Sequence, residues 1–302
     1  MKLALGVDTL SYHCRIEAGE VSHQQICREV SALGFTFLQL NAYHLRAMSP
    51  GDVTSIRKEA NSLGLDLTLS GDVIGRAMNG DTVESGVQRV AAWIELAQAI
   101  GSPFVRVSSG FYRNELLQRP GAILRERDYV IRVLSAAAEQ APPDCTVLLE
   151  NHSDFTPEEY VEIVEQVGAD KMGVFLDLIN PMSMFLDPLP VVCRLVPWAR
   201  AGHVKDYRLV SEYVDDGFHR RGFQVQFCYP GEGIADIRAL VGALLEAGDD
   251  DTEYRLSIEG LDSRAGHDDQ AGRLRESLAC LRAIVADDAA GRARSADPVR
   301  GA

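Results

Sequence analysis

The sequence lacks several features that would assign it at once to a large class of proteins. It contains no run of about 18 apolar residues, so we expect no transmembrane helix. The first 13 residues, MKLALGVDTLSYH, hold one lysine and a short apolar run without a small-residue cleavage site. We therefore expect no secretory signal peptide and no association with a membrane.

Paired cysteines and an excess of basic residues are also missing. No two of the six cysteines have the Cys-x-x-Cys spacing of many metal and redox sites. In a chain without a signal peptide, scattered thiols are typical of a reduced, cytoplasmic protein. The 30 Lys and Arg residues against 44 Asp and Glu residues give a net charge of −14. This balance argues against nucleic-acid binding, because a phosphate backbone requires a basic surface.

What is present is a regular alternation of two kinds of segment. Eight short apolar segments predict strands: Leu3–Asp8, Phe35–Asn41, Asp66–Ser70, Phe104–Ser108, Thr146–Asn151, Met172–Leu178, Ala201–Lys205 and Tyr254–Glu259. Eight longer segments predict helices: Ser22–Leu33, Pro50–Leu63, Val83–Ile100, Arg125–Gln140, Thr156–Val167, Pro188–Val196, Ala235–Ala247 and His267–Ala286. Eight strand–helix repeats favour an α/β fold, a closed (β/α)8 TIM barrel in a single domain. An open doubly wound sheet is the alternative, although no Gly-x-Gly-x-x-Gly motif follows the first strand.

Two segments fall outside this alternation. Residues 206–233 form a long insertion after the seventh strand, and its aromatic and arginine side chains suit a lid or an interface between subunits. Residues 287–302, DDAAGRARSADPVRGA, are polar and aperiodic, and we expect a disordered tail there. The barrel is then expected to span residues 1–286.

Four consecutive strands carry, near their ends, a side chain that can bind a metal ion: Glu150, Asp177, His203 and Glu259. The C-terminal ends of barrel strands meet on one face, which is where such barrels place their functional residues. Carboxylates inside apolar strands are costly to bury unless a cation offsets their charge. Three carboxylates and one imidazole form an oxygen-rich site, which favours Mn²⁺, Mg²⁺ or Co²⁺ and leaves Zn²⁺ possible.

The motifs around these four residues resemble those of the sugar phosphate isomerase/epimerase superfamily, the xylose isomerase-like TIM barrels. The matching runs are Leu149-Glu150-Asn151-His152, Asp177-Leu178-Ile179-Asn180-Pro181, His203-Val204-Lys205-Asp206 and Ser257-Ile258-Glu259-Gly260. The superfamily includes ketose 3-epimerases, inosose dehydratases and the large subunits of C-glycoside-cleaving enzymes. The resemblance implies one divalent metal ion, Mn²⁺ before the others, bound by Glu150, Asp177, His203 and Glu259.

The resemblance also implies an enzyme of carbohydrate metabolism. The leading hypothesis is an isomerase or epimerase that acts on a small ketose or related polyol by proton transfer through a metal-bound enediolate. Glu150 and Glu259 would then be the catalytic acid/base partners. His152 shares a strand face with Glu150 and could be a further catalytic base. That residue keeps a second hypothesis open: a lyase or dehydratase that acts on a keto-sugar, inosose or 3-keto-C-glycoside by elimination β to a ketone.

Four further residues are candidates for binding the substrate: Arg106, Lys205, Arg208 and Asn180. Arg106 interrupts an apolar strand, which favours a place in a pocket. Lys205 could bind a substrate oxygen or could instead pair with Asp206. The resemblance implies a homo-oligomer, or a hetero-oligomer with a small subunit if the chain is a C-glycoside-cleaving lyase.

Two other classes of function agree less well with the same residues. A non-catalytic sugar-binding barrel would not need metal-capable residues on all four strands. A related abasic-site endonuclease would need a richer histidine cluster and a less acidic chain. His13, His23 and His44 have no partner that the sequence identifies, although His44 follows the second strand and could reach the pocket.

Overall fold

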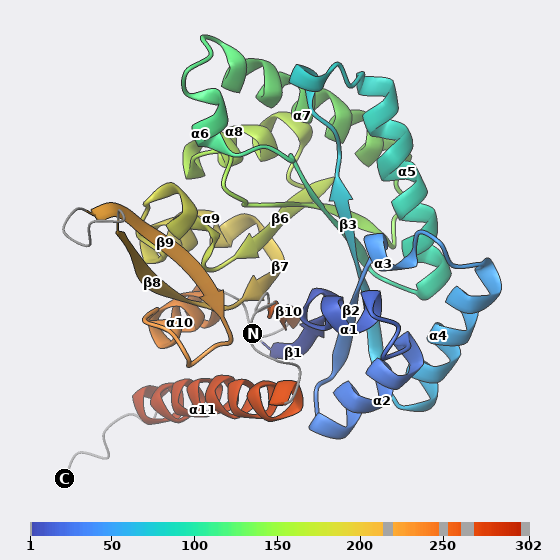
Figure 1. The fold of residues 1–302 in the computed structure, drawn as a ribbon, viewed down its shortest axis with the longest axis vertical. Helices are drawn as coiled ribbons and strands as arrows, with labels where there is room; N and C mark the ends of the chain where they lie inside the picture. The colour runs from blue at the N-terminus through green and yellow to red at the C-terminus, as the bar shows by residue number, and fades with distance from the viewer. Residues whose placement is uncertain (1, 214–219, 248–252, 261–268, 297–302) are drawn as a thin grey trace.

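Eight parallel strands close into a barrel in this computed structural model, which describes residues 2–213, 220–247, 253–260 and 269–296 (Figure 1). The order around the barrel is β1-β10-β7-β6-β5-β4-β3-β2. The strands are β1 Lys2–Asp8, β2 Phe37–Asn41, β3 Asp66–Val73, β4 Phe104–Ser108, β5 Thr146–Glu150, β6 Met172–Asp177, β7 Ala199–Val204 and β10 Glu253–Ile258. The predicted TIM barrel is confirmed, and the expected strands are found with boundaries shifted by a few residues.

Helices follow the strands and cover the outside of the barrel (Figure 1). The longer helices are α2 His23–Leu33, α4 Pro50–Ser62, α5 Val83–Ile100, α7 Ala122–Gln140, α8 Pro157–Val167, α9 Pro188–Leu195, α10 Ile237–Ala247 and α11 Gln270–Ala296. Short helical segments are η1 Thr9–Tyr12, α1 His13–Glu17, α3 Ala42–Leu45, η2 Ala77–Asn79, α6 Arg113–Leu116, η3 Asn180–Met184 and η4 Val196–Trp198.

The helix starts follow the capping residues seen in the sequence. Ser22 accepts a hydrogen bond from the backbone N–H of Gln25 at the start of α2, and Thr156 does the same for Glu159 at the start of α8. Each capping side chain satisfies a backbone donor that the first helical turn would otherwise leave free. Among the helices that the structure describes, none is both long and apolar enough to cross a bilayer.

The interior of the barrel is layered. Phe104, Leu148, Phe175 and Ala201 form a small apolar cluster of inward-facing residues on four adjacent strands. Side chains two positions further along a strand point the same way, so the next layer on β5, β6 and β7 contains Glu150, Asp177 and His203. The Phe175 ring meets the His203 ring edge-on, with centroids 4.6 Å apart. The apolar layer therefore forms a floor beneath the polar residues.

The insertion after β7 contains an antiparallel hairpin. β8 Asp206–Tyr213 pairs with β9 Arg220–Cys228 and forms a separate two-stranded sheet beside the barrel (Figure 1). Residues 214–219 of the insertion lie outside the described residues. The Phe227 ring lies 4.8 Å from Nζ of Lys205, so one end of the hairpin reaches the C-terminal face of the barrel.

The last helix continues past its predicted end. Apolar periodicity predicted an end at Ala286 and a disordered tail over 287–302, whereas α11 extends to Ala296. This corrects the expectation for residues 287–296, and residues 297–302 lie outside the described part. The segment after Ala286 is rich in alanine and arginine, which favour helix even where no apolar stripe continues.

Close packing between β6 and β7 gives a prediction about stability. A Cβ atom at Gly202 would collide with the backbone oxygen of Leu176 on β6. We expect Gly202→Ala to lower the free energy of unfolding by about 1–3 kcal/mol, as overpacked sites do. At Gly242 on α10, a Cβ would meet no described atom within 4 Å. Gly242→Ala should therefore stabilise the chain by up to about 1 kcal/mol. Urea unfolding measures the free energy of unfolding of both variants. An equal change in the two variants would contradict the prediction.

Candidate metal centre

The four predicted ligands converge at the C-terminal end of the barrel. Glu150 ends β5, Asp177 ends β6, His203 lies on β7, and Glu259 directly follows β10. Nδ1 of His203 lies 3.2 Å from Oε1 of Glu150, 3.5 Å from Oε1 of Glu259 and 3.8 Å from Oδ2 of Asp177. All four residues are buried. Carboxylates from three different strands thus surround one imidazole nitrogen.

Two buried cations hold the carboxylates in place. Arg106 on β4 forms an ion pair with Oε2 of Glu150. Nζ of Lys205 lies 2.6 Å from Oδ2 of Asp177 and 2.5 Å from Oε2 of Glu259. Glu150 and Glu259 therefore each engage a cation through one oxygen and turn the other, Oε1, toward His203.

A carboxylate that the sequence analysis missed lies behind the histidine. Oδ2 of Asp8, at the end of β1, is 3.3 Å from Nε2 of His203, and neither atom has a hydrogen-bond partner among the described residues. A carboxylate on the second ring nitrogen commonly orients a metal-binding histidine. The sequence did contain the signal, because Asp8 ends the apolar strand LALGVD as Asp177 ends MGVFLD.

The charges of the cluster fix its protonation. Burial raises the pKa of Glu150, but Arg106 and His203 outweigh it and hold the pKa well below its usual range. Burial likewise raises the pKa of Glu259, and Lys205 and His203 bring it below its ordinary value. Burial lowers the pKa of His203, but Glu259 and the other carboxylates around it raise that pKa to about 10. Both glutamates are therefore ionised at neutral pH, and a proton occupies the imidazole that they surround.

These residues fit a divalent cation. Four buried carboxylates, those of Asp8 and the three acidic candidates, face the buried side chains of Arg106 and Lys205. With His203 neutral, the cluster carries two more negative than positive charges, which one divalent cation would balance. Ligand atoms of Glu150, Asp177 and His203 all lie within 4.8 Å of one another. A metal would take the place of the imidazole proton, as metal binding to histidine requires.

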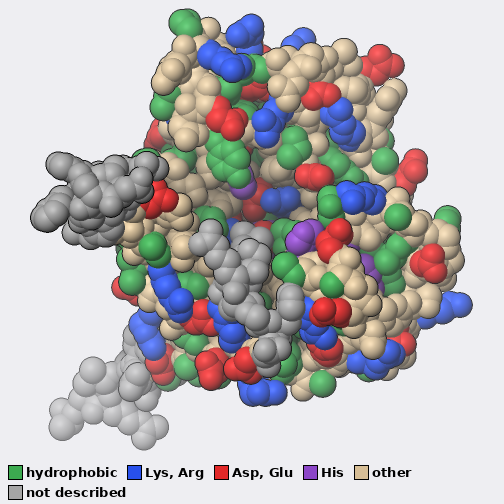
Figure 2. Space-filling model, in the orientation of Figure 1, with side chains coloured by type: hydrophobic (Ala, Val, Ile, Leu, Met, Phe, Trp, Pro, Cys, Tyr) green, Lys and Arg blue, Asp and Glu red, His purple; other side chains and the backbone are tan. Residues whose placement is uncertain are grey.

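The cluster opens into a cavity of about 430 Å³, a size typical of small-molecule sites. Figure 2 shows the hollow near the middle of the face, with histidine, acidic and basic side chains inside it. Glu150, Glu259 and Lys205 line the cavity, whereas Asp177 and His203 are buried and do not belong to its described wall. The other polar or aromatic residues of the wall are His13, Asn41, Tyr43, Asp72, Arg76, Arg106, Ser108, Phe111, Tyr112, His152, Asn180 and Phe227.

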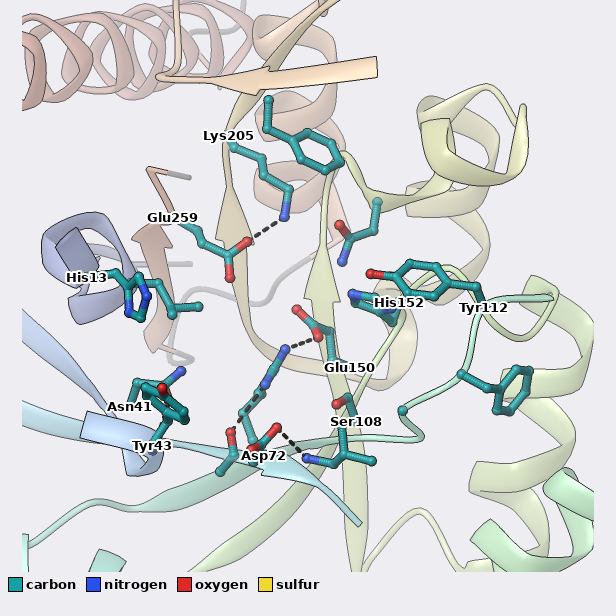
Figure 3. Close-up of a pocket in the computed structure, with 18 of the residues that line it drawn as sticks. His13, Asn41, Tyr43, Asp72, Ser108, Tyr112, Glu150, His152, Lys205 and Glu259 are labelled. Carbon is teal, nitrogen blue, oxygen red and sulfur yellow. Dashed lines mark hydrogen bonds and ion pairs between the residues drawn. The ribbon is translucent and has the colours of Figure 1, made fainter. Parts of the chain in front are cut away.

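Several predicted site residues lie in the wall of this cavity. His152 is in the wall, and its ring centroid lies 5.4 Å from that of Tyr112. Figure 3 shows this pair on the side of the cavity opposite His13. Asn180 lines the cavity too, and its backbone N–H donates to Oδ1 of Asp177 at 2.8 Å. Arg106 and Lys205 line it as well, while each also pairs with a carboxylate of the cluster.

Two sequence expectations differ from the structure. Arg208, a predicted substrate ligand, is exposed on β8, where its Nε donates to the backbone oxygen of Glu232 at 3.0 Å. It does not belong to the described wall of the cavity. The alternative pairing of Lys205 with Asp206 is also not found. Asp206 instead accepts hydrogen bonds from backbone N–H groups, including that of Gly233 at 2.9 Å.

A buried tyrosine fixes the loop that carries His152. The hydroxyl of Tyr160 on α8 accepts a hydrogen bond from the backbone N–H of His152 at 2.9 Å and lies 2.9 Å from the backbone oxygen of Glu150. It also hydrogen-bonds to the carboxylate of Asp154. Burial raises the pKa of Asp154, which the hydrogen bonds from its neighbours counteract.

This network gives a second stability prediction. Tyr160→Phe removes a hydroxyl that satisfies buried groups, and should lower the free energy of unfolding by about 1–3 kcal/mol. The matched control is Tyr254→Phe, because the buried hydroxyl of Tyr254 has no hydrogen-bond partner among the described residues. Removing it should leave stability unchanged or raise it. Urea unfolding measures both, and a Tyr160→Phe variant as stable as the parent would contradict the role assigned to the network.

Comparison with known proteins identifies the family of this chain and one curated relative. The family model described as xylose isomerase-like TIM barrel matches residues 27–284. A curated relative is the 2-epi-5-epi-valiolone 7-phosphate 2-epimerase of Actinoplanes sp. (strain ATCC 31044 / CBS 674.73 / SE50/110), 26% identical over 162 residues. That match covers 52% of this chain and 56% of the relative, so it spans only about half the length of each protein.

Solved structures with the same fold have low sequence identity. An L-ribulose 3-epimerase superposes with a TM-score of 0.69 at 14% identity, over 100% of both chains. The probable 3-DHS dehydratase AsbF from Bacillus anthracis gives 0.64 at 16% identity, over 93% of this chain and 99% of that one. The IOLI protein, solved with a zinc atom, gives 0.63 at 17% identity, over 95% and 98%. At these identities the likeness shows the fold alone.

The family match and the observed topology agree. The matched region begins in α2 and ends in α11, and it includes all four residues of the candidate metal centre. The closed parallel barrel of the structure is the architecture that the family description names. The chain therefore belongs to the xylose isomerase-like TIM barrel family.

Proposed function

We propose that this chain is a divalent-metal-dependent isomerase or epimerase that acts on a small ketose or related polyol. The observation that carries the proposal is the convergence of Glu150, Asp177 and Glu259 on Nδ1 of His203 beside a cavity of about 430 Å³. The half-length similarity to a curated epimerase supports the reaction class.

Glu150, Asp177, His203 and Glu259 are the residues that would hold the metal. The chemistry supplied by a bound divalent ion is polarisation of a ketone, which acidifies the neighbouring C–H group. Three carboxylates and one imidazole favour Mn²⁺ over softer ions. The IOLI relative was solved with zinc, so Zn²⁺ belongs among the ions to be compared.

Glu150 and Glu259 are the proposed acid/base pair. Both line the cavity, and they come from positions on β5 and after β10, with β6 and β7 between these strands in the barrel. In this pair, one ionised carboxylate removes a proton from carbon, and the other, which first takes up a proton from water, delivers that proton to carbon from a second direction. The first carboxylate then releases its proton to water, so both groups are ionised again after turnover. The pairs with Arg106 and Lys205 hold the two carboxylates in fixed orientations.

Three further polar residues of the cavity wall are proposed to bind the substrate. Arg106, Lys205 and Asn180 offer hydrogen-bond donors to hydroxyl or carbonyl oxygens at the cavity wall. His152 is a further proposed base, because its ring lies in the wall and its loop is fixed by Tyr160.

The experiment that tests this function follows hydrogen exchange. Manganese-loaded protein is incubated in D₂O with a panel of ketoses, inososes and 3-keto-glycosides, and the products are examined by NMR and mass spectrometry. We expect one substrate to gain deuterium at the carbon next to its ketone and to give an isomer of otherwise unchanged mass. Glu95→Gln, an exposed substitution on α5, is the matched control and should behave as the parent.

Two other outcomes would reject the proposal. Release of water or an aglycone would instead assign the lyase or dehydratase alternative, in which His152 is the leading base. No deuterium uptake into any member of the panel by metal-loaded protein would contradict both reactions.

A further inference from the structure

Three side chains outside the metal centre form a second cluster of potential metal ligands. These are His13 and Glu17 on α1 and His44 on α3, which follow β1 and β2 respectively. Nδ1 of His13 lies 3.0 Å from Nε2 of His44, and the ligand atoms of all three residues lie within 4.8 Å of one another. The sequence analysis left both histidines without a role, and the proposed function does not use them.

The positions of these residues follow from local structure. His13 and Glu17 are four residues apart on one short helix, so their side chains share a face. His44 is buried on α3, which follows β2, and faces that helix. The neighbouring Arg15 pairs with Glu29 at 3.0 Å, so it does not compete for the carboxylate of Glu17.

The spacing of the nitrogens fits a shared cation. Zinc binds imidazole nitrogens at about 2.0–2.1 Å in tetrahedral geometry, which sets two such nitrogens about 3.3–3.4 Å apart. The observed 3.0 Å is within a few tenths of an ångström of this value. A small opening of the pair would therefore admit the ion without any change in the fold.

The surroundings of His44 support it as a ligand. Its other ring nitrogen, Nδ1, lies 3.2 Å from Oγ1 of Thr9, which also accepts the backbone N–H of Asn41 at 2.8 Å. A hydrogen-bond partner on the second ring nitrogen orients metal-binding histidines and leaves the first nitrogen free to bind. The lone pair of Nε2 is then directed at His13.

We propose that His13, Glu17 and His44 bind a second divalent transition-metal ion of the zinc class. Two nitrogens and one carboxylate favour zinc-type ions, whereas the oxygen-rich centre favours manganese or magnesium. Three protein ligands leave at least one tetrahedral position for water or an oxygen of a bound molecule. Because His13 also lines the cavity, this ion would lie at its rim, on the side opposite His152 (Figure 3).

The test counts metal ions and does not depend on the proposed function. Metal-free protein is dialysed against buffered Zn²⁺, and bound zinc per chain is measured by mass spectrometry of the metal. We expect two zinc ions in the parent chain and one in Asp177→Asn, which retains only the second site. His13→Asn and Glu17→Gln should each reduce the parent value from two to one. Glu20→Gln, an exposed substitution just after α1, is the control and should keep the parent count.

The outcome that overturns the site is equally definite. A zinc count that stays at the parent value in both His13→Asn and Glu17→Gln would mean that the two rings share only a hydrogen bond, whether the parent value is one or two. Glu17 is exposed, so its substitution is not expected to affect folding, and circular dichroism checks this. Crystals soaked in zinc should show an anomalous peak between His13 and His44 if the site exists, and none there if it does not.

Discussion

Replacing Glu259 by glutamine is expected to lower the rate of deuterium exchange by about a hundredfold to ten-thousandfold, the range that general acid–base groups contribute. The carboxylate is buried and ionised, and it lies 2.5 Å from Nζ of Lys205. Glutamine has nearly the same shape but cannot take up a proton from carbon. We expect kcat to fall while circular dichroism shows an intact barrel.

The same substitution at Glu150 should have a similar effect on turnover and a larger effect on stability. Glu150→Gln leaves Arg106 as a buried cation without its ion-pair partner, which is costly. The exposed Glu95→Gln variant controls for the loss of one carboxylate elsewhere. A kcat within tenfold of the parent in metal-loaded Glu259→Gln would contradict its role as an acid/base group.

Removal of the metal is the second change with a large expected effect. The cluster without a cation carries unbalanced negative charge, so chelation should abolish turnover and lower the melting temperature. An ion present at 100 times its dissociation constant stabilises by about 2.7 kcal/mol, which corresponds to a rise in melting temperature of about 4 °C for a chain of 302 residues. Thermal unfolding with chelator and with added Mn²⁺ measures the difference.

Asp177→Asn separates this effect from general ionic stabilisation. The variant loses a carboxylate that both faces His203 and pairs with Lys205, so most of the manganese-dependent rise should disappear. Asp128→Asn on the exposed face of α7 should keep the full rise. An Asp177→Asn variant that retains the whole rise would show that manganese acts at another place.

The sequence was sufficient to predict the barrel and the four proposed ligands for one physical reason. Charged residues that end short apolar strands are conspicuous, and parallel strands bring their C-terminal ends together. Glu150, Asp177, His203 and Glu259 all had this signature. Asp8 also ends a short apolar strand, but its carboxylate lies near Nε2 of His203 and not near Nδ1, where the other carboxylates lie. Closure of the barrel places β1 next to β10 and so brings Asp8 within reach of His203 on β7.

The ion pairs were beyond the reach of the sequence. Arg106 pairs with Glu150 on the adjacent strand, and Lys205 reaches Asp177 and Glu259 on the strands to either side. Such pairs depend on which strands are neighbours, whereas a sequence shows only residues close along the chain. That is why Asp206, next to Lys205 in the sequence, looked like a partner and is not one.

Loops and the C-terminus were predicted least well, for different reasons. Arg208 was proposed to bind the substrate, but its Nε donates to the backbone oxygen of Glu232. The helix after Ala286 has favourable residues without an apolar stripe, so periodicity could not reveal it. The homo-oligomeric state, the cytoplasmic location and the preference for manganese stay predictions.

The central claim, one divalent ion held by residues from four strands, is tested most directly by crystals grown with Mn²⁺. An anomalous difference map collected at the manganese edge should show one peak bounded by Glu150, Asp177, Glu259 and Nδ1 of His203. The same map from Asp177→Asn crystals should lose most of that peak. A map from the parent chain without density there, with Glu150 and Glu259 still in contact with His203, would contradict the account.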